Sequence, residues 1–329
     1  MGAVHATIFT RKRAVLRAVK PALRDRLLHL RSEENLAARV VRDPIQFPKR
    51  YKDPLAQEWV GLLASSLAFG NVTTILAKVE TLIAPLGDAP HRSSSKDLWK
   101  RWKSFRHRVW TGEEIVPLMI AASELQREHG SLGRLFSRFY KQSEGDAMTE
   151  PTVVEASILF VDALRSRITG GELGRAASHL LPSPADGSAC KRLFLYLRWM
   201  VRPRDGIDLG LWDVPTSALL CPIDVHVFRI ASNLGWTTRK TVDLETAKEI
   251  TAALRLVDEK DPVSLDFALC HFGMVSDCKS TRDHEICGAC SMKPHCTVWT
   301  PGKRWTPGKR WTPAKKAAGR LGKKSFPVV

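Results

Sequence analysis

Lys191 and Asp224 are the two residues whose types and positions could carry out chemistry together. We expect each at the start of a helix: one helix opens near Ser188 with Lys191 in its first turn, and another opens at Asp224. The positive end of a helix disfavours the ammonium form of a lysine, so it lowers the pKa and favours a nucleophilic amine. A nearby carboxylate could accept a proton or stabilise developing positive charge.

The helix that carries Lys191 has two predicted faces. Its apolar stripe faces the core and consists of Cys190, Leu193, Phe194, Leu197, Met200 and Val201. Lys191, Arg198 and Arg202 return to a different face and form a basic ridge. Ser188 is a plausible N-cap, and the backbone N–H groups after Gly187 could bind a phosphate. The alternative is a solvated basic face with no function.

The helix that opens at Asp224 turns Val225, Phe228, Ala231 and Leu234 towards a core and ends at Gly235. Aspartate is a favoured N-cap residue, so capping alone is the alternative to a chemical role for Asp224.

A resemblance to a known family favours chemistry. The string from Ile223 to Arg229, IDVHVFR, followed by Leu234-Gly235, resembles the signature of the helix-hairpin-helix DNA glycosylases, the superfamily of endonuclease III. Lys191, preceded by Leu181-Pro182 and Gly187, then matches the hairpin lysine of the bifunctional members.

The loop before Lys191 is longer than in endonuclease III. Asp224 follows Lys191 by 33 positions, which is also a longer separation than in endonuclease III. Both features are closer to the archaeal 8-oxoguanine DNA glycosylases. The run from about Asp43 to Gly273 is similar to an uncharacterised bacterial family of this superfamily, with motifs DPIQFPKRY, LAFGN, HLLPSP, GSACKRL and LRWMVR. Ser66 stands where endonuclease III relatives have a glutamine that fills the gap left by the flipped base.

The resemblance implies an all-α, two-lobed fold with Lys191 and Asp224 between the lobes. It implies a DNA repair glycosylase with AP-lyase activity, whose partner is double-stranded DNA with a damaged base or abasic site. Lys191 would form a Schiff base, Asp224 would assist, and Gly187, Ser188, Arg198 and Arg202 would contact phosphates. An oxidised purine is the substrate suggested by the archaeal enzymes. The alternatives are a noncatalytic DNA-structure or lesion binder of the same fold and an RNA-binding protein.

Four cysteines near the C-terminus have the spacing C-x8-C-x2-C-x5-C: Cys278, Cys287, Cys290 and Cys296. Four cysteines in so short a stretch usually bind metal. Endonuclease III relatives end in a similar motif around a [4Fe–4S] cluster, so the resemblance implies that cofactor. Zinc is the alternative, and disulfides are a further one. The remaining cysteines, Cys190, Cys221 and Cys270, lie in apolar contexts and are expected in the core.

The net charge of +17 comes mostly from the two ends of the chain, which suits attraction to nucleic acid. We expect a basic N-terminal arm over residues 1–31, either a frayed helix or disordered, and a helical domain over 32–275. A metal-cluster loop follows over 276–297. Residues 298–329 form a basic tail with TPGKRW repeats, which we expect to be disordered.

Helix signals recur along the middle of the chain, and no convincing strand alternation is present. No apolar run reaches the roughly 18 residues of a membrane span, and no secretory signal is evident. We therefore expect a cytoplasmic, nucleoid-associated protein without a membrane partner. The sequence indicates no protein partner.

Overall fold

The computed structural model describes residues 19–33, 36–143, 153–169 and 174–299. This part of the chain is predominantly helical, and its two-stranded antiparallel sheet pairs β1 (Arg106–His107) with β2 (Trp110–Thr111). The predicted all-α class is confirmed. None of the helices in the described ranges is both long and apolar enough to cross a membrane.

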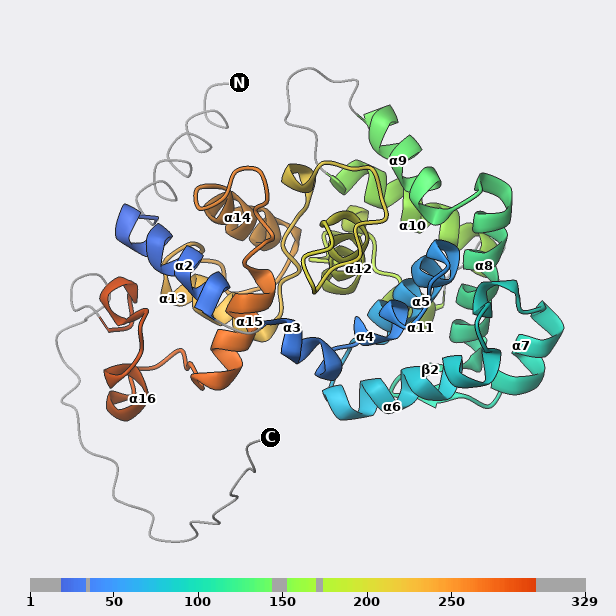
Figure 1. Cartoon of the computed structure of the whole chain (residues 1–329), viewed down its shortest axis with the longest axis horizontal. Helices are drawn as coiled ribbons and strands as arrows, with labels where there is room; N and C mark the ends of the chain where they lie inside the picture. The colour runs from blue at the N-terminus through green and yellow to red at the C-terminus, as the bar shows by residue number, and fades with distance from the viewer. Residues whose placement is uncertain (1–18, 34–35, 144–152, 170–173, 300–329) are drawn as a thin grey trace, which may run out of the picture.

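The helices form two groups on either side of α12 (Lys191–Val201) (Figure 1). One group consists of α5 (Pro54–Ser66), α6 (Val72–Ile83), α7 (Ser95–Trp102), α8 (Gly112–His129), α9 (Leu132–Ser143), α10 (Val153–Thr169) and α11 (Arg175–Leu180). The other consists of α2 (Pro21–Glu33), α13 (Val225–Asn233), α14 (Leu244–Arg255), α15 (Asp266–Val275) and α16 (His284–Gly288).

Shorter elements complete the fold. The helices α3 (Leu36–Arg39) and α4 (Gln46–Lys49) lie between the two groups in Figure 1. Single 3₁₀ turns occur at Val40–Arg42, Ala84–Leu86, Pro90–Arg92, Pro184–Asp186, Thr216–Ala218 and Lys293–His295.

Local capping explains why several helices begin where the sequence predicts. The Asp53 carboxylate accepts a hydrogen bond from the Leu55 amide, and Pro54 occupies the first helical position of α5. Asn71 caps α6 by accepting from the Thr74 amide, and α8 ends at Gly130, whose φ is 81°. The apolar run that follows Pro54 predicts a helix as far as Phe69, before Gly70, but α5 ends earlier, at Ser66.

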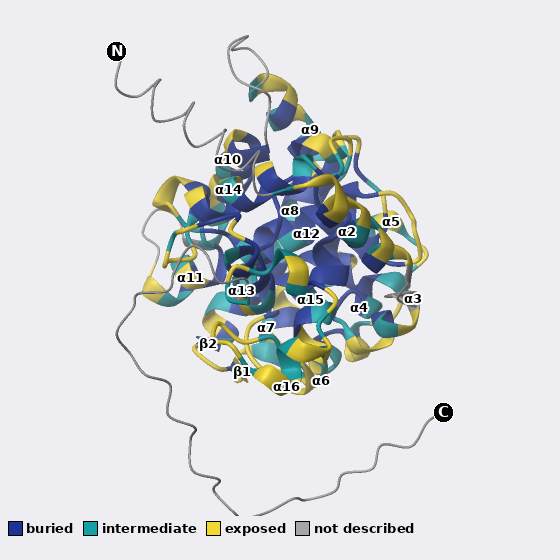
Figure 2. Cartoon of the chain, turned by 90° about the vertical axis from the view of Figure 1, so that its left-hand side faces the viewer, coloured by how far each residue is buried: buried dark blue, intermediate teal, exposed yellow. Residues whose placement is uncertain are grey.

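The central helix α12 is buried on most of its surface (Figure 2). Its predicted apolar stripe is confirmed, since all six of those residues are buried. Tyr196 and Trp199 on other faces are buried as well. The helix packs closely on α5, because a Cβ at Gly61 would lie only 2.7 Å from the Met200 Cε atom. This packing fixes the position of Lys191 at one end of α12.

The predicted N-terminal arm needs correction. Residues 1–18 lie outside the described part of the chain, but residues 21–33 form α2, and Leu23, Leu27 and Leu30 are buried in the core. These leucines recur at helical spacing, so one face of α2 is apolar and packs against the body. The boundary at residue 31 therefore does not separate an arm from the domain. In the predicted C-terminal tail, residues 300–329 also fall outside the described ranges.

Candidate active site and cysteine pocket

The chain enters α12 through an unusual backbone conformation. The helix begins at Lys191, and the residue before it, Cys190, has a φ of 43° and a ψ of 38°. This left-handed conformation is costly for a residue with a side chain, and such strain clusters at functional sites. Ser188 is not the N-cap that we predicted: its hydroxyl accepts a hydrogen bond from the Cys190 amide at 3.2 Å and so shapes the turn before the helix.

Gly187 also differs from its predicted role. Its N–H donates to the Pro184 carbonyl at 3.0 Å, and its own carbonyl accepts from the Leu244 amide at 2.9 Å. The Gly187 N–H is therefore engaged within the fold and not directed at a phosphate. The first N–H groups of α12, which have no partner within a helix, are the donors that remain at this position.

Asp224 caps α13 as predicted. Its Oδ1 atom accepts from the amides of His226 and Val227 at 2.9 and 2.7 Å. Its Oδ2 atom accepts from the thiol of Cys270, with 2.9 Å between sulfur and oxygen. Capping therefore uses only Oδ1, and Oδ2 of this half-buried carboxylate makes its contact outside the helix.

Cys270 connects the two predicted catalytic residues. Burial raises the pKa of its thiol above the usual range, the charge of Asp224 and its hydrogen bond raise it further, and the charge of Lys191 opposes the increase. Asp224 contacts this sulfur atom directly, whereas Lys191, at the start of another helix, acts on the pKa of the thiol through its charge. Sequence reasoning assigned Cys270 to the core, because an isolated cysteine gives no signal of its neighbours.

Asp43 is a second residue near Lys191 that sequence reasoning missed. Burial raises the pKa of its carboxyl group, while a hydrogen bond from the Ile45 amide and the charges of Arg198 and Lys191 lower it. The motif that begins at Asp43 was noticed only as part of the family resemblance. The structure thus places a carboxylate from the N-terminal third of the chain in the surroundings of Lys191.

Arg198 and Arg202 do not form the predicted basic ridge, and their predicted phosphate contacts are wrong. Arg198 is 1% exposed, and its guanidinium pairs with Asp266 at 2.7 Å and with Asp208 at 3.3 Å. Arg202 is 5% exposed and pairs with three carboxylates, those of Asp205, Asp208 and Asp261. The positions of Arg198 and Arg202 on the helix were predicted correctly, but Asp205 and Asp208 of the following loop and the distant Asp261 and Asp266 neutralise them.

The four C-terminal cysteines line one pocket. Its walls also include Asn233 from α13 and the apolar side chains Ile286, Val298 and Trp299. None of the seven cysteines of the chain forms a disulfide. The sequence motif thus becomes a spatial cluster, in a pocket with a largely apolar lining.

A hydrogen-bond donor points at one of these sulfur atoms, since the Asn233 Nδ2 atom lies 3.4 Å from Cys278 Sγ. The backbone amides of Met292 and Lys293 lower the pKa of the Cys290 thiol. Burial and the neighbouring cysteines raise the pKa of both thiols. In the described residues, no three histidine, cysteine or acidic side chains converge closely enough to hold a single metal ion.

The helix α13 links the two sites. Asp224 caps its start, while Arg229 in its middle donates to the Cys278 carbonyl at 2.6 Å. At its last residue, Asn233, the carbonyl accepts from the Thr297 amide at 2.7 Å. The cysteine loop is therefore attached to the helix that positions Asp224.

Comparison with known proteins gave one match. A search of curated proteins and a search of solved structures returned none. Residues 43–275 match the model of a family described as a protein of unknown function, DUF2400. This match covers the first helix group together with α12, α13, α14 and α15, from the motif that begins at Asp43 to the end of α15. The chain therefore belongs to the DUF2400 family.

Proposed function

We propose that this protein is a DNA glycosylase with AP-lyase activity, of the helix-hairpin-helix type that its motifs resemble. The observation that carries the proposal is that Asp224 contacts the Cys270 thiol and that the charge of Lys191 also acts on the pKa of this thiol. An amine and a carboxylate, each half-buried and each at a helix start, supply a nucleophile and a proton acceptor. The strained residue directly before Lys191 supports the same assignment.

In the proposed reaction the neutral amine of Lys191 attacks the sugar C1′ atom of a nucleotide that has been turned out of the duplex. The new C–N bond forms as the bond from C1′ to the base breaks, and the departing base takes up a proton. The amine nitrogen then gives up a proton, which Asp224 accepts, or Asp224 stabilises the cationic sugar. The C1′–O4′ bond of the sugar ring breaks as the C1′=N bond of the Schiff base forms, and O4′ takes up a proton. Elimination at the sugar then cuts the strand.

Asp224 can act in this way only through its Oδ2 atom, because Oδ1 caps α13. The thiol of Cys270 holds Oδ2 in place before a substrate binds. Cys270 is therefore a positioning residue in this proposal. Arg198 and Arg202 have no part in DNA contact, since their charges are neutralised inside the protein.

We propose further that the cysteine pocket holds a [4Fe–4S] cluster bound by Cys278, Cys287, Cys290 and Cys296. Four thiols in one apolar pocket, with an N–H donor directed at one sulfur atom, suit such a cluster. Zinc, which the same four thiolates could bind, is the alternative. When bound, the cluster would supply bonds that tie residues 276–299 to one another.

Borohydride trapping on duplexes that each carry one lesion or an abasic site tests the proposal. The wild type should form a covalent protein–DNA complex with at least one duplex, and Lys191→Gln should form none while it retains DNA affinity. Lys248→Gln, which removes an exposed lysine on α14, is the matched control and should trap normally. A wild type that binds the lesion duplexes without any trapped complex would favour the noncatalytic binder. A preference for single-stranded RNA over every duplex would favour RNA binding.

A further inference from the structure

A basic groove lies along α9, at the other end of α12 from Lys191. The pocket has a volume of about 640 Å³ and is lined by α9 residues and by the loop that contains Leu211, Trp212 and Asp213. This loop is attached to the end of α12, because the amides of Leu211 and Trp212 donate to the Met200 carbonyl at 2.6 and 2.9 Å. A helix rises about 1.5 Å per residue, so α12 separates this groove from Lys191 by roughly 15 Å.

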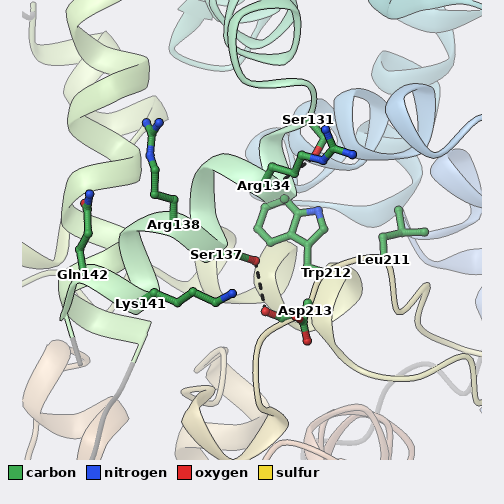
Figure 3. A pocket seen from close by; sticks show the side chains of 10 residues that line it. Ser131, Arg134, Ser137, Arg138, Lys141, Gln142, Leu211, Trp212 and Asp213 are labelled. Carbon is green, nitrogen blue, oxygen red and sulfur yellow. Dashed lines mark hydrogen bonds between the residues drawn. The ribbon is translucent and has the colours of Figure 1, made fainter. Parts of the chain in front are cut away.

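Three cations form one edge of the groove. Arg134, Arg138 and Lys141 are four and three residues apart, so they lie on one face of α9, and all three are exposed. No carboxylate in the described part of the chain pairs with any of them, although Asp213 lines the opposite side. Figure 3 shows their side chains fanned out along the groove instead of converging on one point.

The floor of the groove is rigid. The buried carboxylate of Glu58 accepts hydrogen bonds from the amides of Leu132 and Gly133 at 2.9 and 3.0 Å, and from the Trp212 indole at 2.8 Å. Trp212 also stacks on Phe136 of α9, with 5.3 Å between ring centroids. On the outer side, the Ser137 hydroxyl donates to the Asp213 carbonyl at 3.2 Å (Figure 3). The start of α9 and the Trp212 loop are thus held together without a ligand.

We propose that this groove binds the phosphodiester backbone of a single nucleic-acid strand, at a site separate from Lys191. Along the axis of α9 the cations are spaced by about 6 and 4.5 Å. A row of separated charges suits consecutive phosphates of one strand better than one phosphate group, which would need convergent donors. The pocket is too small for a duplex and has room for a segment of one strand.

The test measures binding of the full chain to a fluorescent twelve-residue oligothymidylate by anisotropy at several salt concentrations. This probe has no lesion or abasic site, so the outcome is independent of the proposed lyase chemistry. The variant Arg134→Gln/Arg138→Gln/Lys141→Gln loses about three phosphate contacts. Its plot of log affinity against log salt should therefore be less steep by about 2, and its affinity should fall at least tenfold at low salt. The same measurement with an oligouridylate should give the same result, because both strands have a phosphodiester backbone.

The matched control, Lys240→Gln/Lys248→Gln/Lys260→Gln, removes three exposed lysines on and beside α14. It therefore has the same net charge as the groove triple variant. Because both variants retain the basic ends of the chain, only the difference between them is assigned to the groove. Equal salt slopes for the two triple variants would overturn the proposal, as would competition by thymidine monophosphate as strong as that by the oligonucleotide. If the groove triple variant melts at a lower temperature, Arg138→Gln alone should still reduce the slope by about 0.7.

Discussion

The Cys270 sulfur lies 2.9 Å from the Asp224 Oδ2 atom. The charge of Lys191 partly offsets the rise in the pKa of the same thiol. Cys270 belongs to α15 and Asp224 to the start of α13, and these two helices pack against each other. The contact therefore fixes the one carboxylate oxygen that capping leaves available. It makes Cys270 the most direct probe of how the site is positioned.

Removing the thiol should reduce catalysis more than it reduces DNA binding. We expect Cys270→Ala to lower the single-turnover lyase rate constant about tenfold, because Oδ2 loses the donor that orients it. Cys270→Ser retains a donor and should stay within about threefold of the wild type. Rate constants are measured on a duplex with an abasic site, and affinity is followed by anisotropy. Identical rates for the two variants would show that the hydrogen bond does not position Asp224.

Substitutions at Asp224 separate capping from chemistry. Asn is as good an N-cap as Asp, so Asp224→Asn should change the free energy of unfolding by less than about 0.5 kcal/mol, whereas Asp224→Ala should cost about 1 kcal/mol. Both variants lose the charge and should lose at least about 100-fold in lyase rate. Urea denaturation and single-turnover kinetics measure the two effects. Full activity in Asp224→Asn would leave capping as the only role of this residue.

Arg198 should matter for stability and not for DNA affinity. Arg198→Met leaves the carboxylates of Asp208 and Asp266 buried without their partner, which costs about 3–5 kcal/mol of unfolding free energy. The salt dependence of DNA binding should be unchanged in protein that remains folded. Arg134→Gln, which removes an exposed arginine, is the control and should be nearly neutral in stability. A stable Arg198→Met variant with a reduced salt slope would restore the phosphate-contact role.

Loss of one cysteine ligand should affect the active site through α13. We expect Cys287→Ser to lower the iron and acid-labile sulfide content of protein purified without oxygen, and to lower the melting temperature. Lyase activity should fall as well, because Arg229 and Asn233 of α13 would lose their hydrogen bonds to the cysteine loop, and α13 positions Asp224. Cys221→Ser, outside the pocket, should retain full iron content. Purified wild type with zinc and no sulfide would establish the other metal.

Protonation of His271 should lower the free energy of unfolding in mild acid. Burial, together with the charges of Arg39 and Arg198, lowers the pKa of His271 to about 4. In the unfolded chain His271 binds a proton near pH 6.5. The contribution of neutral His271 to the free energy of unfolding is therefore fully present above pH 6.5 and is lost as the pH falls to about 4. We expect up to about 3 kcal/mol less unfolding free energy from this group at pH 4 than at pH 7. His271→Gln, which stays neutral, should flatten this part of the curve, measured by urea denaturation at each pH.

The amino-acid sequence by itself determined the helices and their caps. The starts of α5, α6 and α13 follow from Asp53, Asn71 and Asp224, because capping depends on residues only two or three positions apart. The apolar stripe of α12 follows from helical periodicity in the same way. The spacing of the four cysteines likewise indicated that they would gather.

Only the tertiary structure decided what surrounds each charged or reactive side chain. Arg198 and Arg202 are basic residues on a helix face in the sequence, but carboxylates from distant segments neutralise them inside the fold. Cys270 contacts Asp224 from another helix, and the charge of Lys191 acts on the pKa of Asp43, which precedes it by about 150 positions. Helical periodicity gives the face on which a residue lies but not what packs against that face, since those partners are brought together by long-range packing.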